Sequence, residues 1–157
     1  MTNKEIKIAY QEFDVPEQME VQDRKLVEAA IEAMSGSYAP YSSFNVGAAV
    51  LLEDGEIIKG ANQENAAYPS GLCAERTALF YAGSSRPDTA VVSIAIAGGQ
   101  DGKLCKNPVT PCGACRQVMA QTQTRGGRPV SVILIGETKI WRFEKVDDLL
   151  PLIFDSI

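Results

Sequence analysis

Short apolar runs alternate with helical patterns along this chain, and this alternation limits the fold more than any other feature. The runs Ala90–Ala97 and Val130–Ile135 have the length and composition of buried strands. Between them, a polar loop precedes a helix that opens at Pro111. Strands that alternate with helices in this way predict an α/β fold with one mixed central sheet and helices on both faces, a three-layer α-β-α sandwich.

The remaining elements fit the same plan. Two antiparallel strands are expected over Phe44–Leu52 and Glu56–Gly60, because the Asp54-Gly55 pair between them is a strong hairpin-turn signal. The other expected elements are a weak strand within residues 4–13, a helix that ends near Met34, a helix from Cys73 to about Gly83, a strand over Lys139–Phe143 and a short helix over Val146–Leu150. No repeat or linker interrupts this order, so residues 1–157 are expected to form one domain.

The charge balance excludes some classes of partner. The net charge is −5, whereas binding to nucleic-acid backbones requires Lys and Arg to be concentrated on one face. The apolar runs are too short to cross a bilayer, and residues 1–7 lack the apolar stretch of a signal peptide. We therefore expect a cytoplasmic protein with four reduced cysteines, and neither nucleic acid nor membrane as a partner.

The sequence contains no histidine. Histidine is the commonest metal ligand, and the side chain best suited to proton transfer near neutral pH. Any zinc ion in this protein must therefore be held by Cys or carboxylate groups. Proton transfer at neutral pH must use Glu, Asp, Lys, Tyr or Cys.

Three of the four cysteines lie at expected helix starts. In Pro111-Cys-Gly-Ala-Cys, a first helical turn can point the thiols of Cys112 and Cys115 to one side, at a separation suited to a tetrahedral zinc ion. Cys73 opens the other helix, two residues before Glu75. Helix N-termini stabilise thiolates. Two helix starts that meet at one ion would supply three sulfur ligands and leave the fourth position open for water, as in a catalytic site.

Spacing alone leaves other interpretations of the cysteines open. A single Cys-x-x-Cys pair in an α/β protein is often a redox pair, and buried structural cysteine is common. A closed site could use Cys105 as a fourth ligand, although structural zinc sites usually bring two paired knuckles, whereas Cys73 and Cys105 each stand alone. We therefore interpret Cys105 as an unligated loop thiol.

The surroundings of the cysteines resemble the cytidine deaminase family. Cys73-Ala-Glu-Arg followed by Pro111-Cys-Gly-Ala-Cys-Arg-Gln is similar to the zinc-deaminase signature in its all-cysteine form, with a Glu that does not ligate the metal. Three more segments look like family segments in the same order: Phe44-Asn-Val-Gly-Ala-Ala, Asn62-Gln-Glu-Asn-Ala-Ala-Tyr-Pro and Leu149-Leu-Pro-Leu-Ile-Phe. The resemblance covers roughly residues 21–154 and leaves residues 1–20 as an extension without an assigned function.

The resemblance implies hydrolytic deamination of cytidine and deoxycytidine to uridine and deoxyuridine, in pyrimidine salvage. One zinc ion per subunit, held by Cys73, Cys112 and Cys115, would lower the pKa of a water molecule that attacks C4 of the base. Glu75 would take the proton of that water and deliver protons to N3 and the departing amino group. Without the neighbouring cysteine, Glu75 would be interpreted as a solvated carboxylate at a helix start.

Two arginines could moderate the charge of the site. Three thiolates on one divalent zinc ion give a formal charge of −1, which would weaken the ion as a Lewis acid. Arg76 and Arg116 each follow a motif residue and can donate charge-assisted hydrogen bonds to the sulfurs, a role that the resemblance also implies. The alternative is that both are ordinary exposed helix arginines.

For the substrate, the resemblance implies that Asn62 and Glu64 hydrogen-bond the ribose 3′-hydroxyl, that Phe44 stacks on the pyrimidine and that the Ala74 backbone contacts the base. On a strand, positions 62 and 64 project to one face, which permits both side chains to contact the same sugar. Without the resemblance, the first two would be ordinary polar residues at a strand end and Phe44 would be a core residue.

The resemblance also implies a homotetramer with shared active sites, because Tyr68 and Phe154 look like residues that family members contribute across a subunit interface. Asp155 departs from the family pattern, which commonly has glycine at that position.

A deaminase for another aminopyrimidine, such as blasticidin S, is an alternative within the fold, but Arg76 and the Asn62–Glu64 pair favour cytidine. The acidic charge opposes a polynucleotide editor. The non-enzymatic alternative is a structural zinc or redox module.

Overall fold

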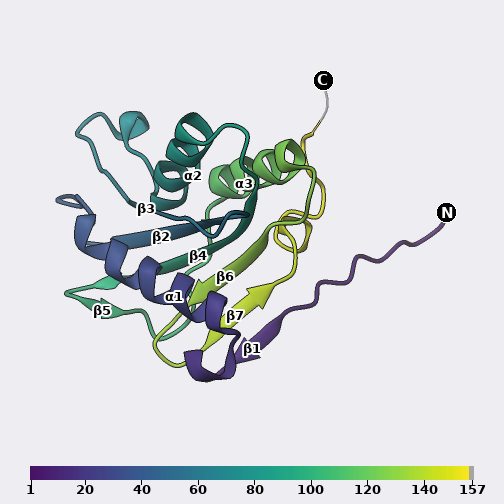
Figure 1. Ribbon diagram of the computed structural model, residues 1–157, viewed down its shortest axis with the longest axis horizontal. Coiled ribbons are helices and arrows are strands. Elements are labelled where there is room, and N and C mark those ends of the chain that lie inside the picture. The colour runs from purple at the N-terminus through teal and green to yellow at the C-terminus, as the bar shows by residue number, and fades with distance from the viewer. Residues whose placement is uncertain (156–157) are drawn as a thin grey trace.

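A seven-stranded mixed sheet runs through the centre of the computed structural model, which describes residues 1–155 (Figure 1). Its main path has the order β1-β7-β6-β4-β2-β3, and β5 pairs with β4. Only β4 and β6 pair in parallel, and the other neighbours are antiparallel. The strands are β1 (Gln11–Phe13), β2 (Asn45–Leu52), β3 (Ile57–Ala61), β4 (Val91–Gln100), β5 (Lys103–Leu104), β6 (Ser131–Ile135) and β7 (Ile140–Phe143).

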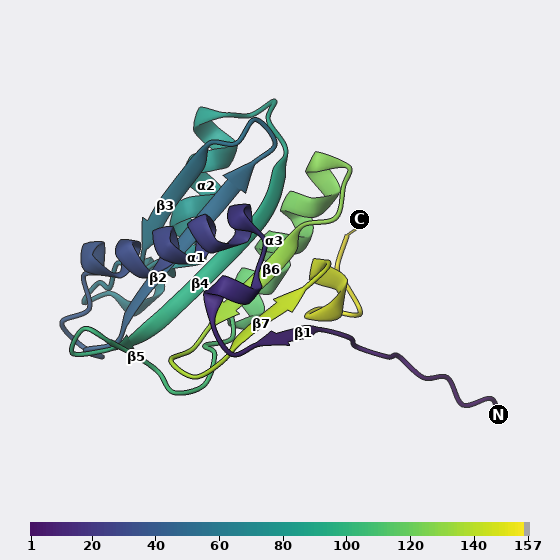
Figure 2. The same cartoon turned by 60° about the horizontal axis from the view of Figure 1, so that its bottom comes forward.

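Helices cover both faces of the sheet, as predicted. Helix α1 (Val21–Ala33) lies on one face, and α2 (Ala74–Ser85) and α3 (Gly113–Gly126) lie on the other (Figure 2). Successive side chains of β4 point to opposite faces of the sheet. Ile94 and Ile96 pack in the core between the sheet and helices α2 and α3, whereas Ala95 packs in the core between the sheet and α1. Burial on both faces explains why the central strands are continuous apolar runs in the sequence.

The hairpin predicted at Asp54-Gly55 is also present. Strands β2 and β3 pair antiparallel, with Val50 opposite Ile58. Gly55 has a φ of +90°, which a residue with a side chain rarely adopts, and its N–H donates to the Leu52 carbonyl at 2.9 Å. The turn chemistry therefore fixes the register of these two strands.

Strand β3 and helix α2 approach each other closely at Gly60. A Cβ atom at this position would lie 2.5 Å from the backbone nitrogen of Ala78. The missing side chain lets α2 lie directly against the edge strand of the sheet. This contact fixes the axis of α2, which begins at the residue after Cys73.

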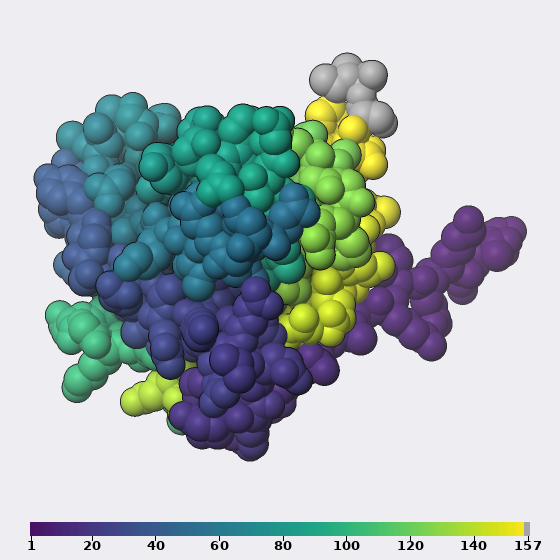
Figure 3. Space-filling view, in the orientation of Figure 1, coloured from purple at the N-terminus to yellow at the C-terminus, as the bar shows by residue number. Residues whose placement is uncertain are grey.

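Some elements differ from the sequence-based expectation. The weak strand signal in residues 4–13 corresponds only to β1, and residues 1–10 have no regular secondary structure and lead away from the body of the chain as an extended arm (Figure 3). At the base of this arm, the Tyr10 ring packs against Trp141 and Phe143, with ring centroids 5.4 and 5.2 Å apart. Strand β5 was not predicted, because two paired residues carry no detectable period. The expected helix over Val146–Leu150 is a single 3-10 turn (Val146–Asp148). Further 3-10 turns cover Pro16–Gln18, Met34–Gly36 and Tyr68–Ser70.

Among residues 1–155, no helix combines the length and the apolar character that crossing a bilayer requires.

Candidate metal centre and adjoining pocket

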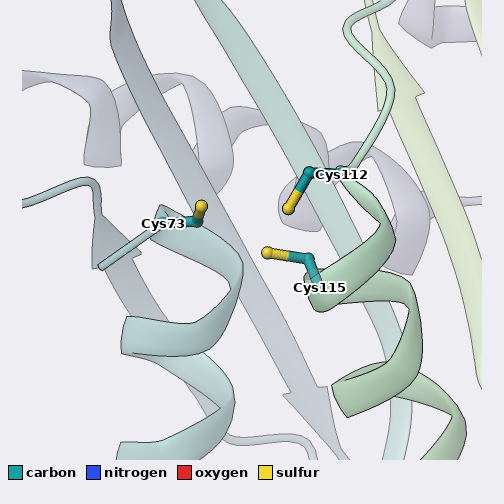
Figure 4. A group of neighbouring side chains, drawn as sticks. All are labelled: Cys73, Cys112 and Cys115. Carbon is teal, nitrogen blue, oxygen red and sulfur yellow. The ribbon is translucent and has the colours of Figure 1, made fainter. Parts of the chain in front are cut away.

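Three cysteine sulfurs converge where the N-termini of α2 and α3 meet (Figure 4). Cys73 is the N-cap residue of α2 and Cys112 is the N-cap residue of α3, while Cys115 lies in the first turn of α3. All three sulfurs lie within 4.8 Å of one another. The geometry therefore gathers the three predicted metal ligands at one point, and the third sulfur, from a separate helix, distinguishes the group from a simple redox pair.

The electrostatics of the cluster favour negative charge on the Cys73 sulfur. The pKa of the Cys73 thiol is lowered, chiefly because the Cys115 thiol donates a hydrogen bond to it, with Arg76 as a further cause. The pKa of the Cys115 thiol is raised by the same hydrogen bond, by burial and by the charge of Glu75. Two helix N-termini add their unpaired N–H groups on the same side. A divalent cation would replace this shared proton and bind all three sulfurs as thiolates.

Cys105 is not a member of this cluster. It follows β5, where its N–H donates to the Gly98 carbonyl at 2.9 Å and its own carbonyl accepts from the Glu137 N–H at 2.8 Å. These contacts hold a half-buried loop thiol away from the helix starts. The arrangement supports the interpretation of Cys105 as unligated and opposes a closed four-cysteine site.

Glu75 is a buried carboxyl group beside the sulfurs. It is the second residue of α2, and only 5% of its surface is exposed. Burial raises the pKa of this carboxyl group, a hydrogen bond from its own backbone N–H opposes the shift, and the nearby charge of Cys73 raises the pKa further. A carboxyl group with a raised pKa can both accept and return a proton near neutral pH.

The two arginines have different partners. Nη2 of Arg76 donates to the Cys73 sulfur at 3.6 Å, and within residues 1–155 its Nε is buried without a hydrogen-bond partner. Arg116 instead donates from Nε to the Pro111 carbonyl at 2.9 Å and from Nη1 to the Leu149 carbonyl at 2.8 Å. Arg76 is thus placed as expected at a sulfur. These two bonds connect the start of α3 to the C-terminal segment. Neither involves a sulfur atom, so they do not support the predicted contact between Arg116 and the cysteines.

A cavity of about 500 Å³ adjoins Cys73. Its walls include Asn62, Glu64, Tyr68 and Arg76, so four predicted site residues besides the cysteine face one space. The remaining lining residues are Tyr41, Ser42, Gln63, Asn65, Gly71 and Leu72. A larger cavity, of about 740 Å³, lies between the C-terminal halves of α2 and α3 and contains none of the predicted site residues.

Asn62 and Glu64 do not lie on a strand, contrary to the sequence-based expectation. Strand β3 ends at Ala61, and the segment that follows is irregular. Only Gln63 forms isolated bridges there, with Tyr38 and Leu72. Side-chain hydrogen bonds, which a strand period does not predict, hold the two residues in place.

Asn62 is anchored to the start of β2. Its Oδ1 accepts from the Val46 N–H at 2.8 Å and from the Ser37 hydroxyl, and its Nδ2 donates to the Phe44 carbonyl at 2.9 Å. An amide nitrogen has two hydrogens, and the Phe44 carbonyl accepts one of them. Within residues 1–155 the structure shows no acceptor for the second hydrogen, and Asn62 lines the cavity.

Phe44, Ala74 and Phe154 do not line this cavity. Phe44 is half-buried directly before β2, and its ring occupies the space that a side chain on Gly98 would need, because a Cβ atom there would lie 3.2 Å from Cε1 of the ring. Ala74 is fully buried at the first position of α2. Tyr68 and Phe154 are 74% and 68% exposed, so both aromatic side chains lie largely on the surface of the chain.

The comparisons with known proteins agree with this geometry. A family model described as the cytidine and deoxycytidylate deaminase zinc-binding region matches residues 20–127. A cytidine deaminase of Halalkalibacterium halodurans is 56% identical over 97 residues, which cover 61% of this chain and 68% of that protein. A cytidine deaminase of Mycobacterium tuberculosis is 38% identical over 125 residues, which cover 78% of this chain and 81% of that protein.

Solved structures give the same result. The crystal structure of cytidine deaminase from Burkholderia pseudomallei superposes with a TM-score of 0.70 at 40% identity, over 83% of this chain and 97% of that chain. The crystal structure of cytidine deaminase from Mycobacterium tuberculosis has a TM-score of 0.68 at 33% identity, over 87% of this chain and 100% of that chain. The matched family region includes all three cysteines of the cluster and Glu75.

Proposed function

The chain belongs to the cytidine and deoxycytidylate deaminase family, and from this membership we propose that it deaminates cytidine and deoxycytidine hydrolytically, as an enzyme of pyrimidine salvage. The observation that carries the proposal is the convergence of three sulfurs with one buried carboxyl group, next to a cavity of about 500 Å³. We further propose that residues 1–157 act as one domain, with residues 1–20 as an extension, in the cytoplasm, where the sulfurs stay reduced.

The donor set fits zinc. Three thiolates from Cys73, Cys112 and Cys115 would hold one ion per subunit and leave a position for a further ligand. When bound, zinc supplies the Lewis acidity that brings the pKa of a water molecule toward neutrality. Arg76 would draw electron density from the Cys73 sulfur through its hydrogen bond and so preserve part of that acidity.

Glu75 would carry the protons of the reaction. Its buried carboxylate accepts a proton from the attacking water and then donates to N3 of the cytosine ring, which makes C4 a better electrophile. After the attack, it takes the remaining proton of the new hydroxyl group on C4 and delivers this proton to the 4-amino group, so that the C4–N bond breaks, the C4 carbonyl forms and ammonia leaves rather than an amide anion. The raised pKa of Glu75 supports this double role, because the base of one step must be the acid of the next.

The cavity wall would bind the nucleoside. We assign the ribose 3′-hydroxyl to Asn62 and Glu64 in this wall. Phe44 and Ala74 do not line the cavity, and their assignment to stacking on the pyrimidine and to a backbone contact with the base rests on the family resemblance alone. The free amide hydrogen of Asn62 and the carboxylate of Glu64 offer one donor and one acceptor, which suits a hydroxyl group. A 5′-phosphate should be disfavoured, because Glu64 adds negative charge to the cavity wall.

Glu64→Ala should lower kcat/KM for cytidine about 10- to 100-fold and leave the weak reaction with free cytosine within about twofold. A hydrogen bond to a charged group contributes roughly 1.5–3 kcal/mol, and 1.4 kcal/mol corresponds to a factor of ten. Binding energy from the sugar also orients the base, so kcat should fall together with affinity. Steady-state kinetics on both substrates measure the difference, and the exposed variant Glu28→Ala serves as the control. Equal losses for cytidine and cytosine would mean that Glu64 does not hold the sugar.

We also propose a homotetramer with shared active sites. Tyr68 lies at the cavity wall and Phe154 lies near the C-terminus, and each exposes a large aromatic side chain that is typical of a protein contact. Phe154 would reach the cavity of another subunit, since it does not line its own. Light scattering should therefore give about four times the chain mass of 16.9 kDa. A fully active monomer would contradict this arrangement.

A further inference from the structure

The loop between α1 and β2 folds over the segment that follows β3. The Tyr38 N–H donates to the Asn62 carbonyl at 2.9 Å, and the Glu64 N–H donates to the Tyr38 carbonyl at 2.8 Å. These two backbone bonds place residues 41–44 next to the Glu64 side chain. The loop therefore forms part of the cavity wall, to which it contributes Tyr41 and Ser42.

This loop holds both oxygens of the Glu64 carboxylate. Oε2 accepts from the backbone N–H of Tyr41 at 2.8 Å and from that of Ser42 at 3.2 Å, and Oε1 accepts from the Ser42 hydroxyl. The pKa of Glu64 is lowered, with the Ser42 hydroxyl as the largest cause and the Tyr41 N–H as the next. The carboxylate is thus kept ionised and in one orientation.

The direction of the Ser42 hydroxyl is itself determined. The Phe44 N–H donates to Ser42 Oγ at 3.0 Å, so one lone pair of that oxygen is occupied and its hydrogen is left to Glu64. Ser43, between the two, has a φ of +56°, a left-handed conformation that is unfavourable for a residue with a side chain. This backbone conformation turns the chain between Ser42, which contacts Glu64, and Phe44, which leads into β2.

We propose that Ser42 is a positioning residue for substrate class: its hydroxyl orients the Glu64 carboxylate toward the sugar, and this orientation supports the preference for nucleosides over free bases. The inference rests on the proposed role of Glu64 in binding the 3′-hydroxyl. Ser42 acts through Glu64 and does not touch the reacting atoms. Its loss should therefore weaken recognition of the sugar while the chemistry on the base is preserved.

The test compares Ser42→Ala with two other variants. Ser42→Thr keeps the hydroxyl at an exposed position, and Ser35→Ala removes a hydroxyl that donates to the Glu32 carbonyl. We expect kcat/KM for cytidine to fall about tenfold in Ser42→Ala, whereas that for cytosine stays within about twofold. Ser42→Thr and Ser35→Ala should stay near the wild type. Zinc content should be unchanged in all three variants.

A double-mutant cycle with Glu64→Ala separates this inference from the proposed function. In the Glu64→Ala background, Ser42→Ala should lower cytidine turnover by less than about twofold, because the group that it orients is already absent. Full additivity of the two losses would overturn the inference, as would equal losses for cytidine and cytosine or loss of zinc in Ser42→Ala. If Glu64→Ala alone does not discriminate between the two substrates, the proposed sugar site is wrong and the inference falls with it. If Glu64→Ala discriminates and Ser42→Ala does not, only the inference fails.

Discussion

Glu75→Gln should lower cytidine turnover by about 10²- to 10⁴-fold or more, while the bound zinc stays at one ion per chain. This is the largest effect that we expect of a single substitution. Glutamine has almost the same shape as glutamate but cannot accept and return a proton. General acid–base groups typically contribute roughly this factor in one step, and Glu75 would serve several steps. Single-turnover kinetics and metal analysis on the same preparation measure both quantities.

The burial of Glu75 makes this experiment informative. Only 5% of the residue is exposed, so the neutral amide avoids the cost of placing a charge in that environment, and the variant should fold at least as well as the wild type. Glu28→Gln, on the exposed side of α1, is the matched control. If Glu75→Gln keeps more than about a tenth of the wild-type rate, another residue transfers the protons.

Cys112→Ser should lose stoichiometric zinc and nearly all activity, whereas Cys105→Ser should keep both. Cys112 is the most exposed member of the sulfur cluster, so its replacement removes a ligand with little effect on core packing. A hydroxyl is a much poorer zinc ligand than a thiolate, and two sulfurs cannot form the three-ligand site of a catalytic zinc ion. Metal analysis after dialysis against a weak chelator compares the two variants directly.

Cys105 provides the control because the structure holds it apart from the cluster. Its backbone bonds to Gly98 and Glu137 do not depend on the thiol, so serine should be tolerated. Loss of zinc from Cys105→Ser, together with an inactive protein, would indicate a closed four-cysteine site. That result would contradict a catalytic metal centre in this chain.

Local patterns predicted most of the fold. Strands β4 and β6 are visible as apolar runs because both of their faces are buried, and the β2–β3 hairpin is visible because Asp54-Gly55 suits its turn. The same patterns could not reveal β5, whose two residues are too few to show a period. They also overextended the N-terminal strand, because alternation in residues 4–10 has no neighbouring strand to pair with.

The site was predictable to the extent that its chemistry is local. Cys112 and Cys115 occupy one helical turn, and Cys73 with Glu75 occupies another, so each half could be recognised from spacing. The hydrogen bonds between distant segments could not be predicted in this way. Ser42 lies 22 residues from Glu64, and Arg116 lies 33 residues from the Leu149 carbonyl that it contacts. The periodicity of the sequence does not predict such pairs, because only tertiary packing brings the two residues of each pair together.

The most direct test of the proposed deamination is the ultraviolet absorbance of cytidine, deoxycytidine, cytosine and CMP during incubation with the zinc-loaded protein. Deamination changes the absorbance of the base, and released ammonia provides an independent measure. We expect rapid conversion of both nucleosides, with cytosine and CMP converted poorly, because the cavity wall is proposed to bind the sugar and carries the charge of Glu64. A protein that holds one zinc ion per chain and leaves cytidine unchanged would contradict it.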